Sequence, residues 1–151
     1  MIKLEDKSKL ASKYKVELIW DKQTGGLAGI EGQPELKFDI PKNYGGLGRY
    51  YCADEIFLAS LGWCILATFI DFKRKLRLPL KDVRVSLSSS IELRNDGYHI
   101  ARIQGSLDAI VKKGQQANAE RCAELAKEYC HLTRAIRKTI PIEISTNILE
   151  G

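Results

Sequence analysis

Apolar and polar residues alternate along the first part of the chain. Every second residue between positions 13 and 20 is apolar, which predicts a strand with one buried face and one face in water. A turn is expected at residues 21–26, followed by two shorter apolar stretches at 27–30 and 36–40. Together these stretches predict a three-stranded antiparallel meander that ends at Pro41.

A glycine-rich loop at residues 42–49 leads into the most apolar part of the chain. Residues 56–70 carry no charge, and Asp54 and Glu55 precede them, as is favoured at the positive end of a helix dipole. We expect a helix that is apolar on every side and therefore buried at the centre of the fold. Its fifteen uncharged residues span about 22 Å, less than the roughly 30 Å hydrocarbon core of a membrane, so we expect no membrane span.

The second half of the chain alternates strand and helix patterns. A long strand is expected around residues 83–93, a hairpin turn at 95–97 and a returning strand at 98–111. Apolar residues then recur every three or four positions from about residue 118 to 130, which predicts an amphipathic helix, and a final strand is expected at 140–144. The element order is β-β-β-α-β-β-α-β, so we predict the α+β class, with antiparallel sheets around the buried central helix.

The length of the chain, 151 residues and 17.0 kDa, is that of one ordinary domain. We expect a single domain over residues 1–151, with a frayed segment at 1–12. The sequence begins with charges that alternate with single apolar residues and lacks the apolar core of a signal peptide, so we expect a cytoplasmic protein. Its four cysteines are then expected as free thiols, either functional or buried, rather than as a structural disulfide framework.

The net charge of +5 and the sequence pI near 9.0 raise the question of a nucleic-acid partner. The positive charges are spread along the sequence, and their densest cluster, at residues 73–77, falls at the end of the apolar helix. The helix dipole favours cations at that end. We therefore expect no nucleic-acid partner.

A helix that is hydrophobic on every side needs neighbours on every side. One subunit of this size offers two small sheets and a second helix, which are too few to cover it. We therefore expect an obligate homodimer in which the two central helices pack together. The N-terminal strands of one chain are expected to extend the sheet of the other.

Two of the cysteines lie in surroundings that could give a thiol a function. Cys64 lies in the middle of the apolar helix, which suits either a small buried hydrophobic residue or a functional thiol. Cys130 ends the apolar stripe of the second helix, beside a polar, cationic segment of the kind that lowers a thiol pKa. The residues of this segment are His131, Thr133 and Arg134.

The other two cysteines are expected to be structural or incidental. Cys122 lies eight residues before Cys130, about 12 Å along a helix, which is too far for a disulfide within that helix. Cys52 is similarly far from its nearest neighbouring cysteine. No paired-cysteine motif suggests zinc, and the isolated Gly-Gly pairs at 25–26 and 45–46 make no phosphate cradle, so we expect neither a metal nor a cofactor.

The combination of these features resembles the OsmC/Ohr family of hydroperoxide-reducing proteins. The segments that carry the resemblance are the acidic pair and helix at 54–64, the second helix at 119–130 and the strand at 141–144, within a similarity that covers about residues 14–148. The resemblance implies an intertwined homodimer with two active sites at the subunit interface. It also implies that Cys64 is the peroxidatic thiolate and Cys130 the resolving thiol, with an organic hydroperoxide as substrate and an external dithiol as reductant.

The resemblance also suggests which residues assist the thiols. Asp54 occupies the place of the family's catalytic carboxylate, with Glu55 beside it. On a continuous helix Asp54 would lie about 15 Å from Cys64, so it would have to act across the dimer or through a broken helix start. Leu27 stands where the family's efficient hydroperoxidases carry an arginine, so another cation is needed to stabilise the thiolate. The candidates for this cation are Arg49 and Arg134.

Three functions are compatible with the sequence. The first is the thiol-dependent reduction of organic hydroperoxides in oxidative-stress defence. The second is redox sensing or disulfide exchange by the same fold without efficient peroxidase turnover, which the missing arginine favours. The third is a binding module that holds a hydrophobic ligand in an apolar pocket, with both cysteines structural.

Overall fold

The computed structural model describes residues 12–151, so the expected frayed segment at 1–12 lies almost entirely outside the described residues. By its internal contacts the chain divides into two compact units, residues 1–53 and 54–151. The first unit contains a small sheet. The second contains a larger sheet and the helices that pack on it.

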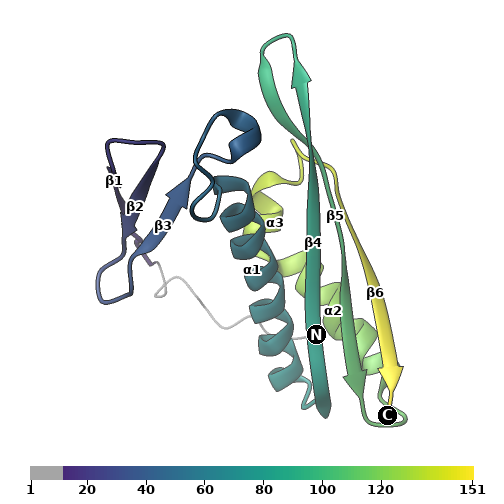
Figure 1. The fold of residues 1–151 in the computed structure, drawn as a ribbon. Helices are drawn as coiled ribbons and strands as arrows, with labels where there is room; N and C mark the ends of the chain where they lie inside the picture. Colours follow the sequence, from purple (N-terminus) through teal and green to yellow (C-terminus); the bar gives the residue numbers. More distant parts are fainter. Residues whose placement is uncertain (1–11) are drawn as a thin grey trace. The chain divides into compact units, whose positions relative to one another are not determined.

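The small sheet is the expected antiparallel meander of β1 (Glu17–Trp20), β2 (Gly25–Gly29) and β3 (Leu36–Asp39) (Figure 1). A short 3-10 helix, η2 (Lys42–Tyr44), follows it. β1 begins at Glu17 rather than at residue 13, and all of its residues are exposed. The expectation of a buried face on this strand is wrong for the single chain, because the unit has no second layer of its own to cover the sheet.

The pair Gly25-Gly26 lies inside β2 rather than in a turn. A Cβ atom at Gly25 would lie 2.3 Å from the carbonyl oxygen of Phe38, and one at Gly26 would lie 2.6 Å from that of Ile19. Both distances are far below van der Waals contact. The neighbouring strands therefore approach β2 so closely that only glycine fits at these two positions.

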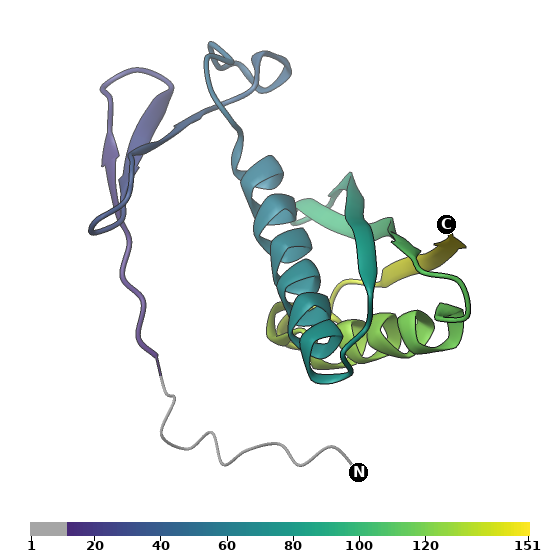
Figure 2. The ribbon, with the colours of Figure 1, turned by 90° about the horizontal axis from the view of Figure 1, so that it is seen from below.

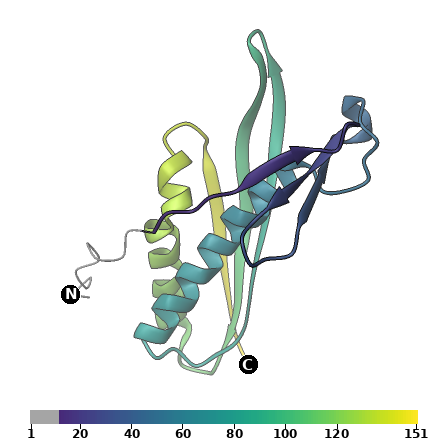
Figure 3. The same ribbon diagram turned by 90° about the vertical axis from the view of Figure 1, so that its left-hand side faces the viewer.

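The larger sheet consists of β4 (Leu80–Arg94), β5 (Gly97–Val111) and β6 (Ile142–Glu150). β4 and β5 pair antiparallel through the expected hairpin turn, and the tip of this hairpin projects beyond the helices of the unit (Figure 3). β6 pairs with β5 in parallel, which corrects the expectation of antiparallel pairing alone. The reason is the helical crossover between β5 and β6, which returns the chain to the end of the sheet where β5 began.

The α-helices of the described chain are α1 (Ala53–Lys75), α2 (Gln116–Tyr129) and α3 (His131–Ile136). α1 and α2 lie on the same face of the larger sheet (Figure 2). α3 follows α2 almost without interruption and was not expected, because six residues are too few to show a helical period. The predicted α+β class is confirmed.

The core of the second unit fills the space between the two long helices and one face of the sheet. Its largest fully buried side chains are Leu61, Ile65 and Phe69 of α1 with Ile103, Leu107 and Val111 of β5. The other face of the sheet is polar and carries hydrogen bonds such as that from Asn147 to Asp108. The sheet is therefore buried on one face and wet on the other, as the alternation in its strands predicts.

Within the single chain α1 is buried on one face only; the cover for its other side was expected from a second subunit. Ile65 and Phe69 are fully buried, whereas Trp63 is 63% exposed and Ile70 is 39% exposed. The larger sheet and α2 bury the side of α1 that faces them. The apolar side chains on its free side have no neighbour within the second unit to bury them.

α1 is also longer than expected. Its 23 residues extend about 34 Å, so the argument that it is too short to cross a membrane is wrong. By length and composition alone it could span one. Its buried face, packed in the core of the second unit, makes it the core helix of this fold.

The carboxylate of Glu150, in β6, closes the start of α2. Its Oε1 accepts hydrogen bonds from the backbone N–H groups of Gly114, Gln115 and Gln116, at 2.8, 3.1 and 3.2 Å. Gln115 is the capping residue, but its own side chain makes no capping hydrogen bond. A side chain from a distant strand therefore supplies the cap that the helix lacks locally.

We expect Glu150→Ala to lower the free energy of unfolding by about 1 kcal/mol, because it removes the acceptor of three N–H groups and a negative charge at the positive end of α2. Glu150→Gln keeps an acceptor and is expected to lose less. Urea denaturation measures both, with Glu143→Ala in the same strand as a control. Equal stability of Glu150→Ala and the unmutated protein would contradict this capping role.

Candidate functional site

Cys130 occupies the break between α2 and α3. Its backbone is extended, with φ −60° and ψ 113°, so it ends one helix and begins the next. Its sulfur accepts a hydrogen bond from the backbone N–H of Thr133 at 3.4 Å, as the oxygen of a serine or aspartate does at a helix start. The turn of the chain at this residue leaves the thiol fully buried.

The sulfur atoms of Cys64 and Cys130 lie 3.0 Å apart. Cys64 lies on the buried face of α1 and is 7% exposed. A disulfide bond is about 2.05 Å long, so an approach of about 1 Å would join the two sulfurs. The structure thus brings together the two cysteines that the family resemblance paired.

Burial raises the pKa of the Cys64 thiol, and the neighbouring Cys130 thiol raises it further. Hydrogen bonds from the backbone N–H groups of Leu132 and His131 lower the pKa, but less strongly. The balance lies above the ordinary thiol value. Cys64 is therefore mostly protonated at neutral pH, and its reactivity requires a group that takes up its proton.

The polar segment after Cys130 surrounds the thiol pair differently from the sequence-based expectation. Nδ1 of His131 lies 3.4 Å from the sulfur of Cys64, the thiol of the other helix. Thr133 is buried, and among the described residues its hydroxyl oxygen has no hydrogen-bond partner. Arg134 is exposed on α3, and the hydrogen bonds of the two sulfurs do not include its side chain.

The acidic pair lies in the first turn of α1, where both side chains are exposed. α1 runs without interruption from Ala53 past Cys64, so the alternative of a broken helix start is wrong. Asp54 lies ten residues before Cys64 on this helix, a separation of about 15 Å. Neither Asp54 nor Glu55 can reach the sulfur within one chain.

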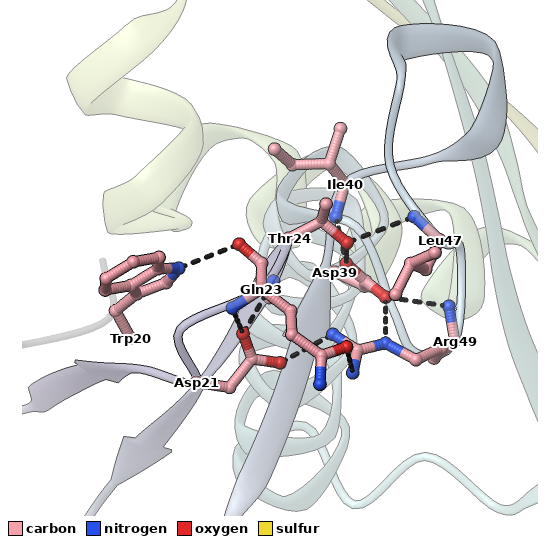
Figure 4. Close-up of polar contacts among 9 residues, drawn as sticks. Trp20, Asp21, Gln23, Thr24, Asp39, Ile40, Leu47 and Arg49 are labelled. Atoms are coloured by element: carbon pink, nitrogen blue, oxygen red, sulfur yellow. Dashed lines mark hydrogen bonds and ion pairs between the residues drawn. The ribbon is translucent and has the colours of Figure 1, made fainter.

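Arg49 belongs to a polar network of the first unit (Figure 4). Its guanidinium forms ion pairs with Asp39, at 2.6 Å, and with Asp21, and it donates to the side-chain oxygen of Gln23 at 3.1 Å. Thr24 completes the network with a 2.6 Å hydrogen bond to Asp39. The network ties the turn after β1 and the end of β3 to the loop that carries Arg49.

The charge of Arg49 is matched by these carboxylates. Its hydrogen bond lowers the pKa of Asp39 far below the usual range, and the pKa of Arg49 itself is raised, first by Asp39 and then by Asp21. A guanidinium that already neutralises two carboxylates has little field left for a thiolate. Arg49 is therefore a poor candidate for the cation that would stabilise the thiolate in place of the family's arginine.

The remaining cysteines take no part in the thiol pair. Cys122 is fully buried, and this burial raises its pKa. Cys52 is half-buried, and none of the four cysteines is joined to another by a disulfide. Within residues 12–151, no three His, Cys, Asp or Glu side chains gather as they would around a metal ion.

A groove of about 450 Å³ lies between α1 and β4. The residues that line it are Glu55, Leu58, Ala59, Gly62, Trp63, Leu66, Val85 and Leu87. Gly62 and Leu66 each lie two residues from Cys64, about 200° around the helix. The groove is therefore on the side of α1 away from the thiol pair.

Comparison with protein families supports the resemblance seen in the sequence. The model of the family described as OsmC-like protein matches residues 46–145. The matched range contains α1, which carries Cys64, and the helices α2 and α3 on either side of Cys130. It ends inside β6. No curated protein matches the chain.

Solved structures share the fold over nearly the whole chain. An OsmC-like protein from Mycoplasma pneumoniae is 14% identical, with a TM-score of 0.79, and the match covers 91% of this chain and 98% of that one. An organic hydroperoxide resistance protein from Legionella pneumophila is 20% identical, with a TM-score of 0.72 and coverage of 90% and 97%. Another from Elizabethkingia anophelis, with thiocyanate bound, is 17% identical, with a TM-score of 0.71 and coverage of 93% and 98%. The expected OsmC-like fold is confirmed.

We expect mild oxidation with diamide to produce a disulfide between Cys64 and Cys130, because their sulfurs need to approach by only about 1 Å. Peptide mapping under non-reducing conditions detects it. Cys122→Ala is the matched control and is expected to form the same bond. A disulfide that joins Cys64 to Cys52 or Cys122 instead would contradict the geometry of the site.

Proposed function

The chain belongs to the family of OsmC-like proteins, and we propose that it reduces organic hydroperoxides with the thiol pair Cys64 and Cys130. The observation that carries the proposal is the 3.0 Å contact between the two sulfurs. Two of the solved structures that share its fold are described as organic hydroperoxide resistance proteins. We place the activity in the cytoplasm, where dithiol reductants keep such thiols reduced.

The proposed reaction has three steps. The Cys64 thiolate attacks one peroxide oxygen, so that the S–O bond forms, the O–O bond breaks and the other oxygen leaves as an alcohol after taking a proton. The sulfenic acid on Cys64 then condenses with the Cys130 thiol, which releases water and forms the disulfide. An external dithiol reduces this disulfide by exchange.

The burial of the two thiols suits this sequence. Cys130 is fully buried beside Cys64, so it can condense with the sulfenic acid before a second peroxide oxidises the sulfur further. Apolar side chains of the core surround the pair. Such surroundings favour a peroxide with an alkyl or aryl group over hydrogen peroxide.

We also propose that the active protein is a homodimer. Trp63 and Ile70 expose large apolar side chains on the free side of α1, as do Leu18, Ile19 and Trp20 on β1. Apolar surface of this extent is typical of an interface. In this arrangement the α1 helices of two subunits pack together, the N-terminal strands of one chain extend the partner's sheet, and Asp54 and Glu55 act on the thiol across the interface.

A second function, redox sensing or disulfide exchange without efficient peroxide turnover, is favoured by the raised pKa of Cys64. A buried, protonated thiol attacks peroxides slowly, yet the adjacent Cys130 still permits a reversible disulfide. The two functions differ in rate with peroxide, not in the disulfide that they form.

We expect the reduced protein to react with cumene hydroperoxide in stopped-flow experiments and to lose two thiols per molecule. Cys64→Ser is expected to lose the reaction entirely. Cys130→Ser is expected to keep one fast turnover and then stop, with a sulfenic acid that dimedone traps. Cys122→Ala, a cysteine outside the pair, serves as the control and is expected to react like the unmutated protein.

Other results would redirect the assignment. If Cys64→Ser reacts as fast as the unmutated protein, the peroxidatic role of Cys64 is wrong. Slow reaction with every peroxide, together with ready exchange with a dithiol, would support the sensing function instead. No loss of thiols with any peroxide and no exchange with a dithiol would support a module that binds a hydrophobic ligand.

We expect the protein to sediment as a dimer at micromolar concentration and Trp63→Glu to sediment as a monomer, because a charge on the free side of α1 cannot be buried without a partner. Leu149→Glu is the control: it changes another exposed apolar residue, 64% exposed on β6, and is expected to remain dimeric. A stable monomer of the unmutated protein in sedimentation equilibrium would refute the proposed dimer.

A further inference from the structure

The contact between His131 and Cys64 gives the thiol a proton acceptor. His131 is the first residue of α3 and is exposed, with its Nδ1 at 3.4 Å from the sulfur of Cys64. It reaches α1 because the chain turns at Cys130, between two helices. The ring therefore joins a buried thiol on one side to solvent on the other.

The hydrogen bonds around the two sulfurs indicate which way the proton of Cys64 points. The Cys130 thiol donates to the sulfur of Cys64, and the sulfur of Cys130 accepts from the N–H of Thr133. Each thiol has one proton to donate. With the Cys130 proton directed at Cys64, the Cys64 proton is free to be donated to Nδ1 of His131, which requires the ring tautomer that carries its hydrogen on Nε2.

In the described chain, no arginine side chain hydrogen-bonds either sulfur. Leu27 stands where the family's efficient hydroperoxidases carry an arginine, and Arg49 is paired with two carboxylates of its own unit. Burial meanwhile holds the proton on Cys64. A neutral imidazole, with an ordinary pKa of about 6.5, is a base suited to thiol activation near neutral pH.

We propose that His131 is the general base that removes the proton of Cys64 and the general acid that returns it to the departing oxygen of the peroxide. In the first step the S–H bond breaks and an N–H bond forms at Nδ1, which leaves a thiolate beside an imidazolium. In the second step the Cys64 sulfur forms an S–O bond as the O–O bond breaks, and the departing alkoxide takes the proton from Nδ1. The imidazole is then neutral again, and no further oxidant or reductant is consumed.

The peroxide step of this inference rests on the proposed function, whereas the proton transfer does not. The titratable groups that face the ring's Nδ1 are the Cys64 thiol of α1 and, behind it, the Cys130 thiol. On its own helix, α3, the charged residue is Arg134, three residues on from His131.

The test is the pH dependence of the Cys64 thiolate, read from its ultraviolet absorbance as the difference between each protein and the same protein with Cys64→Ala. In the unmutated protein we expect the thiolate signal to begin to rise at a lower pH than in His131→Gln, because the imidazole accepts the Cys64 proton. In His131→Gln we expect this early rise to be lost, leaving one titration at alkaline pH. The rate of Cys64 alkylation at neutral pH is expected to fall at least about tenfold.

His99→Gln is the matched control, because His99 is the other histidine of the chain and pairs with Asp96 at the tip of the β4–β5 hairpin. It is expected to titrate like the unmutated protein, and urea denaturation verifies that His131→Gln is still folded. An unchanged thiolate titration in folded His131→Gln would overturn the proposal.

Reaction with cumene hydroperoxide separates this proposal from the proposed function. If the thiolate titration depends on His131 but no protein consumes peroxide, the proton transfer stands and the peroxidase function fails. If His131→Gln consumes peroxide as fast as the unmutated protein with an unchanged thiolate titration, the function stands and the role of His131 is wrong.

Discussion

The contact between the sulfurs of Cys64 and Cys130 depends on the break in the chain between α2 and α3. The extended backbone at Cys130 ends one helix and begins the next, and it is this turn that buries the thiol beside the middle of α1. The approach of α1 to α2 is in turn set by the sheet, because both helices pack on the same face of β4, β5 and β6. Glu150 adds a direct link, since a residue of the sheet caps the helix that leads to Cys130. The thiol pair is therefore a product of the whole second unit, not of a local motif.

The same burial that brings the thiols together opposes their chemistry. Removing Cys64 from water penalises its charged form, which raises the pKa of the group that has to become a thiolate. The start of α3 offsets part of this cost with the backbone N–H groups of His131 and Leu132. The ring of His131 contacts the sulfur of Cys64 and is exposed, so it can exchange protons with solvent. A site built in this way keeps its thiol protonated and protected until a base removes the proton, which suits a residue that has to avoid irreversible oxidation.

The periodicity of the sequence was sufficient to predict the strands of the larger sheet and α2, because each buries one face and so repeats its apolar residues at a regular spacing. α1 was predicted instead from its long run without charged residues. It also placed Cys130 at the end of the stripe of α2. It could not reveal α3, which is too short to show a period, or the parallel pairing of β6, which depends on the length of the crossover. The contact between His131 and Cys64 joins residues 67 positions apart, and no local pattern signals it. Gly25 and Gly26 looked like turn residues because glycine serves both turns and close strand contacts, and only the neighbouring carbonyl oxygens distinguish the two.

A single chain covers only one face of α1, and the uncovered face bears on the chemistry. α1 leaves Trp63 exposed on its free side and keeps Asp54 about 15 Å from Cys64 on one continuous helix. A rigid helix cannot fold back to bring its first turn to its middle, so a carboxylate from this turn can meet a thiol only on another copy of the chain. Burial of the free face of α1 and delivery of that carboxylate would therefore require the same event, the association of two chains. His131, in contrast, contacts Cys64 within one chain, so proton removal from the thiol and carboxylate assistance become separable contributions to the proposed reaction.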